Sequence, residues 1–305
     1  MIDTTQNKYL ITIIGPTAIG KTALAIEVSK HFNCEILSAD SRQFFKEMTI
    51  GTAVPNNEEL AAAPHHFIQN ISVFEDYTVG DFERDAIAKL DELFKVNNYA
   101  VLVGGSGLYI DAVLKGFDDF PDIAPEIRQG IIENYEQHGI EFLQKQLEEL
   151  DPMHYQKVAK ENPQRLMRAL EVCIGSGKPY SSFLNIKKNS RNFIPIIIGL
   201  EADREVMYNR INQRVDIMTQ TGLVEEAKAL YPNKKLNALQ TVGYRELFSH
   251  FDDEFTLDFA LEEIKKNTRR FAKRQMTWFK RTEGAKWFDF KTATSEIINY
   301  IEQTL

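Results

Sequence analysis

The sequence has few cysteines, no long hydrophobic run and no low-complexity segment. None of its apolar runs approaches the roughly 18 residues that a transmembrane helix needs, and its first residues lack the basic stretch of a signal peptide. Two cysteines, Cys34 and Cys173, are too few for a disulfide framework or a four-cysteine zinc site. We therefore expect a soluble cytoplasmic protein with no membrane partner, acting as a monomer.

The remaining composition is that of an ordinary globular protein. Hydrophobic residues make up 43% of the chain and charged residues 26%, which argues against disordered, collagen-like and coiled-coil classes. A length of 305 residues predicts about two domains, or one large α/β domain with an insertion.

The net charge of −8 conceals a basic segment near the C-terminus. Eight Lys and Arg residues lie between Lys265 and Arg281 without an Asp or Glu, which leaves 28 basic against 44 acidic residues elsewhere. On a helix, one stripe would contain Ile264, Thr268, Phe271, Gln275 and Trp278, with most basic residues outside it. Two interpretations stay open: a polyanion-binding surface, for which we expect Arg270 and Arg274 to bind an RNA backbone, or a solvated helix packed through Phe271 and Trp278.

Short β-branched segments alternate with helical segments along most of the chain. Strands are expected at 8–14, 34–39, 99–103 and 193–200, and helices at 22–32, 79–96, 204–219, 223–231 and 257–281. This alternation predicts an α/β fold with a parallel sheet flanked by helices.

One polar stretch interrupts the alternation. Residues 118–191 contain helical patterns at 124–138, 140–150 and 163–175 and no strand signal. We therefore expect a P-loop α/β core in two parts, 1–117 and 192–305, with 118–191 as a helical insertion domain.

A phosphate-binding loop follows the first expected strand. The sequence matches G-x-x-x-x-G-K-[ST] with the required strand before it and helix after it, through Gly15, Pro16, Thr17, Ala18, Ile19, Gly20, Lys21 and Thr22. Glycines let backbone N–H groups turn toward phosphate oxygens, Lys21 neutralises their charge, and Thr22 is the expected ligand of Mg²⁺. The motif specifies a polyphosphate with Mg²⁺ and nothing about the rest of the ligand.

The third strand does not end in the acidic residue that many P-loop ATPases use for Mg²⁺. It ends in Gly104-Gly105-Ser106-Gly107, which suggests that backbone and the Ser106 hydroxyl approach a ligand closely, although a turn required by chain geometry is the alternative. Asp40 follows the second strand, where open α/β sheets bind ligands, and is either a general base or a helix cap.

Two further pairs of residues, one of arginines and one of histidines, are candidates for a binding site. Arg210 and Arg214 lie one helical turn apart and suit a diphosphate clamp, or are simply a surface pair. His65 and His66 have no third ligand at metal spacing, so we interpret them as structural.

Taken together, the segments resemble the tRNA dimethylallyltransferase family, also called tRNA isopentenyltransferases. Besides the phosphate loop, the resemblance rests on segments that span nearly the whole chain: 38–43, 50–53, 64–66, 77–82, 102–109, 163–172, 242–245 and 272–278. It implies transfer of a dimethylallyl group from dimethylallyl diphosphate to N6 of the adenine on the 3′ side of the anticodon in tRNA.

The resemblance also implies roles for individual residues. Asp40 is the expected general base, Ser106 helps to orient the adenine, and residues 17–22 hold the donor's diphosphate, on which Lys21 acts. Arg210 and Arg214 join this diphosphate site on the strength of their spacing alone. The insertion is expected to grip the anticodon stem-loop. The expected tRNA contacts are Asp40, Ser41, Arg42, Gln43, Ser106, Arg128, Gln164, Arg165, Leu166, Met167, Arg168, Thr241, Gly243, Tyr244 and Arg245. For Tyr244, a packed aromatic is the alternative.

The sequence departs from the family pattern at several positions. Ser106 stands where Thr is usual, and Phe45, Thr49 and Asn162 replace a common Tyr, an acidic residue and an Asp. Two other functions use some of the same features: a P-loop kinase of a nucleoside or small metabolite, and an RNA-binding ATPase or scaffold.

Overall fold

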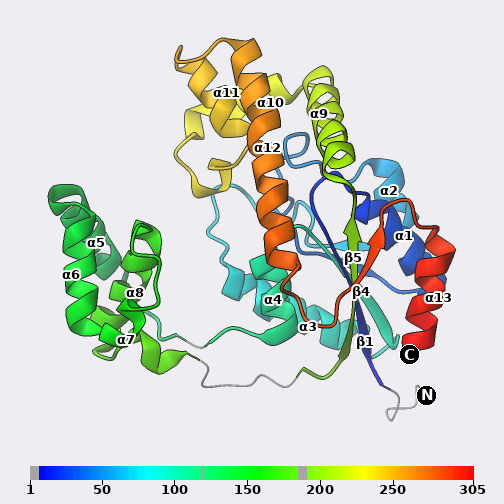
Figure 1. The fold of residues 1–305 in the computed structure, drawn as a ribbon, viewed down its shortest axis with the longest axis horizontal. Helices are drawn as coiled ribbons and strands as arrows, with labels where there is room; N and C mark the ends of the chain where they lie inside the picture. The colour runs from blue at the N-terminus through cyan, green and yellow to red at the C-terminus, as the bar shows by residue number, and fades with distance from the viewer. Residues whose placement is uncertain (1–6, 119, 185–190) are drawn as a thin grey trace. The chain divides into compact units, whose positions relative to one another are not determined.

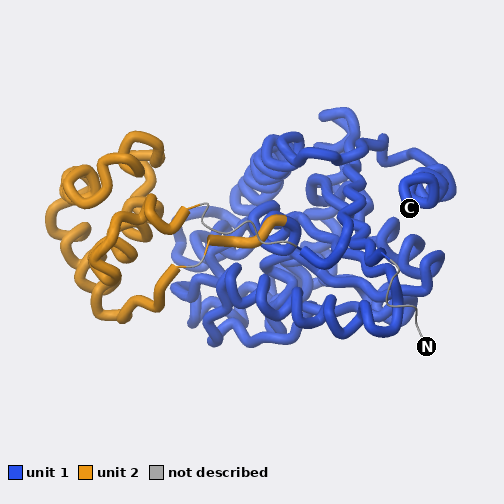
Figure 2. Tube along the Cα trace, turned by 90° about the horizontal axis from the view of Figure 1, so that it is seen from below, with its two compact units in different colours: residues 1–114, 191–305 blue, residues 115–190 orange. Residues whose placement is uncertain are grey.

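The computed structural model describes residues 7–118, 120–184 and 191–305. The chain forms two compact units, one of residues 1–114 and 191–305 and one of residues 115–190, which Figure 2 distinguishes by colour. The sequence boundaries of the second unit differ by only a few residues from those of the expected insertion, 118–191.

A parallel sheet, flanked by helices, forms the centre of the first unit (Figure 1). It has six strands in the order β3-β2-β4-β1-β5-β6. Its strands are β1 Tyr9–Ile14, β2 Ile36–Ser38, β3 His65–His66, β4 Tyr99–Val103, β5 Ile194–Glu201 and β6 Lys286–Asp289. The four expected strands form its four central positions. The two edge strands, β3 and β6, are too short and too polar to show a strand pattern.

Helices cover both faces of this sheet, as the α/β prediction requires. On one face, Ile11 and Ile13 of β1 belong to a core with residues of α1 (Lys21–Phe32) and α13 (Thr294–Thr304). On the other, Leu10 and Ile14 belong to a core with residues of α3 (Val79–Leu93) and α4 (Gly107–Lys115). Alternate side chains of one strand therefore anchor opposite helical layers.

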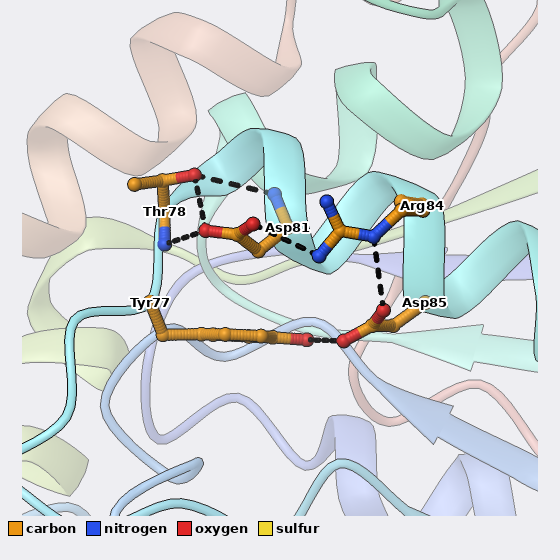
Figure 3. Close-up of polar contacts among 5 residues, drawn as sticks. All are labelled: Tyr77, Thr78, Asp81, Arg84 and Asp85. Atoms are coloured by element: carbon orange, nitrogen blue, oxygen red, sulfur yellow. Dashed lines mark hydrogen bonds and ion pairs between the residues drawn. The ribbon is translucent and has the colours of Figure 1, made fainter. Parts of the chain in front are cut away.

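The start of α3 shows how local sequence sets an element boundary. Thr78 Oγ1 accepts the N–H of Asp81 at 3.2 Å and Asp81 Oδ2 accepts the N–H of Thr78 at 2.9 Å, which is a capping box (Figure 3). Tyr77 donates its hydroxyl to Asp85, and Arg84 pairs with Asp81 and Asp85. Part of the family-like segment 77–82 is thus explained by helix capping.

A second group of helices follows β5 and forms its own core. It contains α9 (Arg204–Gln220), α10 (Leu223–Leu230), α11 (Tyr244–Phe251) and the long α12 (Leu257–Phe279). Buried residues of all four helices join Phe45 and Met48 in one cluster that includes Val215, Leu223, Tyr244, Phe248 and Ile264. This cluster holds α12 beside the loops that follow the strands.

The regular structure of the second unit is helical in its described residues, 115–118 and 120–184. It consists of α5 (Pro125–His138), α6 (Ile140–Leu150), the short α7 (Pro152–Tyr155) and α8 (Pro163–Ser176), followed by a 3-10 turn, Tyr180–Phe183. Its core contains Ile131, Leu143, Leu147, Leu166 and Leu170. In the first unit, α2 (Asn57–Ala62) completes the α-helices of the described residues.

Candidate functional site

The phosphate loop lies between β1 and α1 and leaves the N-terminus of α1 facing a cavity of about 780 Å³. All residues from Thr17 to Thr22 line this cavity. Backbone N–H groups at a helix start and the positive end of the helix dipole favour an anion here. The loop therefore has the arrangement that its sequence predicts.

Lys21 is held at the cavity by its own loop. Its Nζ donates to the carbonyl of Pro16 at 2.8 Å. Burial, opposed by the nearby Asp40 carboxylate and assisted by the charge of Arg214, lowers the pKa of Lys21 to about 8. A bound dianion would stabilise the ammonium form that burial disfavours.

Asp40 caps a turn, not a helix. Its Oδ1 accepts the N–H of Arg42 at 3.1 Å, as Asp side chains do in turns. Burial raises the pKa of Asp40, and the hydrogen bond from Arg42 and the charge of Lys21 oppose that rise. The capping interaction uses one carboxylate oxygen and leaves the geometry compatible with a base role as well.

A second cavity, of about 470 Å³, adjoins the first. Its walls come from the loop after β4, from α9 and α12, and from residues 240–243 and Arg245. Seven residues line both cavities: Thr17, Asp40, Thr52, Ala53, Arg214, Met218 and Gln275. Asp40 therefore lies where a group bound in one cavity can meet a group bound in the other.

The glycine-rich loop after β4 is packed closely against α12 and also lines the smaller cavity. A Cβ at Gly105 would collide with the side-chain amide of Gln275, and one at Gly107 would collide with the ring of Trp278. The glycines thus admit side chains of α12 beside the cavity. Ser106 Oγ accepts the N–H of Ser41 at 3.0 Å and lies 3.0 Å from the Ser41 hydroxyl, so it fixes the turn that carries Asp40.

Gln275 is a site residue to which the sequence interpretation assigns no role. Its Oε1 accepts the N–H of Thr17 at 2.9 Å, and its Nε2 donates to the carbonyl of Gly105 at 2.8 Å. The residue is only 6% exposed. One signal of its role is present in the sequence, because Gln275 is an amide on a stripe that is otherwise mostly apolar.

The stripe on α12 lines the smaller cavity. Its five residues, Ile264, Thr268, Phe271, Gln275 and Trp278, all contribute to the wall. Phe271 is 37% exposed and Trp278 40% exposed, so both rings are partly packed and partly open to the cavity, and the ring of Trp278 lies against Gly107. Trp278 donates its indole N–H to Asp111 at 2.8 Å, which fixes the orientation of the ring.

Acidic residues in the preceding turn of α12 and on α9 and β5 supply part of the acidic charge that the basic segment lacks. Lys265 pairs with Asp216 and Glu262, Lys266 with Glu263, and Lys280 with Glu201. Arg270 and Arg274 are exposed and have no acidic partner among the described residues. The free positive charge on α12 is therefore smaller than the sequence count indicates.

The two arginines of α9 do not form the symmetric clamp that their spacing suggests. Arg210 Nε donates to the carbonyl of Ala18 at 2.8 Å, and its guanidinium lies over the Phe290 ring. Arg210 thus supports the phosphate loop from outside the cavities. Arg214 lines both cavities and is the member of the pair that a diphosphate can reach.

Some expected tRNA contacts are structural. Tyr244 is fully buried and donates its hydroxyl to Glu226 at 2.6 Å, so its side chain is not available to tRNA. Arg42 donates to the carbonyls of Asn237 and Ala238, and Gln43 donates to those of Thr52 and Ala53. The wall of the smaller cavity still includes six of the expected tRNA contacts that are open to a ligand: Ser41, Arg42, Ser106, Thr241, Gly243 and Arg245.

In the second unit, α8 presents a polar surface over a buried core. Glu171 pairs with both Arg128 and Arg168, and Arg128 also donates to Gln164. Gln164, Arg165 and Arg168 are exposed, whereas Leu166 and Met167 are buried in the unit's core. Burial excludes side-chain contacts of Leu166 and Met167 with tRNA.

The described residues contain no group of three or more His, Cys, Asp or Glu side chains that could hold a metal ion. His65 contacts the carbonyl of Ala63 through Nδ1 and lines the larger cavity, where its buried Nε2 has no partner among the described residues, and His66 pairs with Glu35. No helix in the described part of the chain has the length and hydropathy needed to span a membrane.

Comparison with known proteins places this geometry in context. Residues 43–282 match a family profile described as IPP transferase. The chain is 68% identical over 304 residues to a tRNA dimethylallyltransferase of Flavobacterium johnsoniae, covering 98% of each chain, and 61% identical to one of Christiangramia forsetii, covering 98% of this chain and 99% of the relative.

Solved structures agree. A tRNA isopentenylpyrophosphate transferase of Bacillus halodurans is 34% identical with a TM-score of 0.73, covering 98% of this chain and 96% of that one. A eukaryotic dimethylallyltransferase acting on tRNA is 24% identical with a TM-score of 0.82, covering 97% of this chain and 80% of that one, and shows the same fold.

Proposed function

The chain belongs to the IPP transferase family of tRNA dimethylallyltransferases, and on that premise we propose how its site performs prenyl transfer. The chain transfers a dimethylallyl group from dimethylallyl diphosphate to N6 of the adenine on the 3′ side of the anticodon and releases diphosphate. Family membership decides against the kinase and the RNA-binding scaffold. The observation that carries the proposal is the pair of adjoining cavities with Asp40 in the wall of both.

The larger cavity receives the donor. Its diphosphate lies against the N-terminus of α1, where Lys21 and the backbone N–H groups of the phosphate loop contact its oxygens, and Arg214 approaches from α9. Negative charge grows on this group as the carbon–oxygen bond breaks, so these contacts strengthen toward the transition state.

Thr22 is the protein ligand that fits a Mg²⁺ ion at this loop. Mg²⁺ keeps several waters and is commonly bound through one or two protein oxygens plus substrate phosphates, so it needs no dedicated cluster of acidic residues. The lack of such a cluster among the described residues agrees with that mode of binding. When bound, the ion supplies further neutralisation of the diphosphate.

The smaller cavity receives the adenine. Phe271 and Trp278 offer aromatic surface for stacking, and Arg274 lies between them in sequence on the same wall. A base that reacts at an exocyclic group must leave its stack, which costs a few kcal/mol that such contacts offset. Ser106 orients the adenine indirectly, by holding the Asp40–Ser41 turn.

The transfer step uses Asp40 as base. The N6 lone pair forms a bond to C1 of the dimethylallyl group, the C1–O bond breaks with its electron pair leaving on diphosphate, and Asp40 takes the N6 proton. The raised pKa of Asp40 suits this role, because a more basic carboxylate accepts a proton more readily.

Exposed cations on both units bind the tRNA backbone. They are Arg270 and Arg274 on α12, Arg245 in the first turn of α11, and Arg165 and Arg168 in the insertion, which grips the anticodon stem-loop with the partly exposed Arg128. We further propose that the protein acts as a monomer in the cytoplasm, where tRNA is found.

A direct assay tests the function. The purified chain is incubated with an anticodon stem-loop RNA, Mg²⁺ and dimethylallyl diphosphate, and the RNA nucleosides are analysed by mass spectrometry. Prenylated adenosine at the position next to the anticodon is expected, and a matched RNA with guanosine at that position should stay unmodified. Modification of neither RNA, or phosphorylation of a nucleoside from ATP, would contradict the assignment.

A further inference from the structure

Gln275 connects the loop that holds the donor with the loop beside the acceptor. The side chain reaches from α12 to the N–H of Thr17 in the phosphate loop and to the carbonyl of Gly105 after β4. Both hydrogen bonds have ordinary lengths, and Gln275 lies in the wall of both cavities. A single carboxamide thus joins three segments that are far apart in the sequence.

The protein makes room for this contact. Because a Cβ at Gly105 would collide with Gln275 Nε2, glycine at this position permits the approach of the amide. The neighbouring Gly104 similarly lies against the backbone of Ala39, next to Asp40. The loop after β4 therefore fits between Asp40 on one side and Gln275 on the other.

Only an amide of this length satisfies both partners. Thr17 offers a donor and Gly105 an acceptor, and a glutamine side chain carries the complementary acceptor and donor. A carboxylate keeps the acceptor but loses the donor, and an apolar side chain offers no partner to the part-buried N–H of Thr17 or to the buried carbonyl of Gly105.

We propose that Gln275 is a positioning residue that couples the donor's diphosphate site to the tRNA-binding helix α12. This inference rests on the proposed function. Because α12 also carries Trp278 and Arg274 on the cavity wall, tRNA bound to this helix stabilises the position of Gln275 and with it the phosphate loop. By linkage, diphosphate bound to the loop raises the affinity for RNA by the same factor.

Three measurements test the coupling on Gln275→Met, which keeps an unbranched side chain of similar length. Amide hydrogen exchange of the peptide containing Thr17 is expected to accelerate, without RNA or donor present. The affinity for the stem-loop RNA should rise on adding Mg²⁺ and inorganic pyrophosphate in the wild type but stay constant in the variant. Single-turnover transfer should fall about 100-fold, the effect expected for misplaced reactants.

Two companion variants separate positioning from general damage. Gln275→Glu retains an acceptor for Thr17, so exchange of that peptide should stay slow even where transfer falls. Gln213→Leu changes an exposed glutamine of the neighbouring α9 and should leave exchange, coupling and rate unchanged.

The possible results are distinguishable from failure of the proposed function. If the wild-type protein does not prenylate RNA, the proposed function is rejected. Hydrogen exchange then still reports whether Gln275 holds Thr17 and Gly105 together. If Gln275→Met keeps wild-type exchange, or keeps the pyrophosphate effect on RNA affinity at full size, the coupling is overturned although the enzyme remains a prenyltransferase. A variant that unfolds is replaced by Gln275→Glu, for which an unchanged transfer rate would equally reject the proposal.

Discussion

Asp40 and Lys21 each oppose the effect of burial on the other's pKa. Burial favours the neutral form of both groups, raising the pKa of Asp40 and lowering that of Lys21, while each charge favours the charged form of its neighbour. The phosphate loop and the turn after β2 are therefore linked electrostatically before any substrate binds. Two expected pH effects follow from this pair.

The first concerns Asp40 as base. Asp40→Asn should lower single-turnover transfer by ~10²–10⁴-fold, the usual contribution of general-base assistance, with little change in RNA or donor affinity. The base must be unprotonated, so the wild-type rate should rise with pH as Asp40 loses its proton. This rise should occur at a higher pH than for an ordinary aspartate, because burial raises the pKa of Asp40. Asp253→Asn is a control, since Asp253 has a positive φ that Asn tolerates and lies on a distant turn. Wild-type transfer by Asp40→Asn would move the base role to another residue.

The second concerns proton uptake at Lys21. The free enzyme has a Lys21 pKa of about 8, and a bound diphosphate raises it, so binding above that pH takes up a proton and weakens as pH rises further. Calorimetry of pyrophosphate binding at about pH 8.5, in two buffers with different ionisation enthalpies, measures the uptake. The Lys21→Arg variant should bind pyrophosphate without proton uptake, because arginine stays charged. Equal heats in both buffers for the wild type would contradict the prediction.

Most of the sheet could be predicted from the sequence, but the partners of α12 could not. The strands that contain β1, β2, β4 and β5 follow from short apolar runs, and the phosphate loop follows from fixed spacing between β1 and α1. Periodicity also finds the stripe on α12. It does not reveal what a stripe faces, and here Phe271 and Trp278 face a cavity.

Pairings between distant residues explain the other differences. The charge count around Lys265 is correct, yet Asp216 on α9 neutralises part of it. Tyr244 lies in a family-like segment, but it is buried in the cluster of α9 to α12 and its hydroxyl donates to Glu226 on α10. Neither partner is visible from local spacing.

The exposed arginines of α12 should set the salt dependence of RNA binding. Each lost phosphate contact reduces the log–log slope of affinity against salt by about one, so Arg270→Gln with Arg274→Gln should flatten it by up to about two. The matched control removes the same charge elsewhere: Lys30→Gln with Lys89→Gln changes two lysines of α1 and α3 that already pair with glutamates. An equal loss of slope in both double variants would indicate a general effect of net charge instead of contacts on α12.

Trp278 should stack on a base of the bound RNA. The ring is 40% exposed in the cavity wall and is oriented by its bond to Asp111. Stacking contributes about 1–3 kcal/mol per base, so Trp278→Ala should weaken stem-loop binding by that amount, while Trp278→Phe recovers part of it.

Fluorescence provides a second test of this stacking. The chain has two tryptophans, so Trp287→Phe leaves Trp278 as the only one, and RNA should then quench the remaining fluorescence. Because Trp287 lies beneath the ammonium of Lys280 on the sheet edge, its signal in the reciprocal variant Trp278→Phe should respond little. Quenching confined to Trp287 would place the RNA away from this wall and leave Trp278 with a packing role against Gly107.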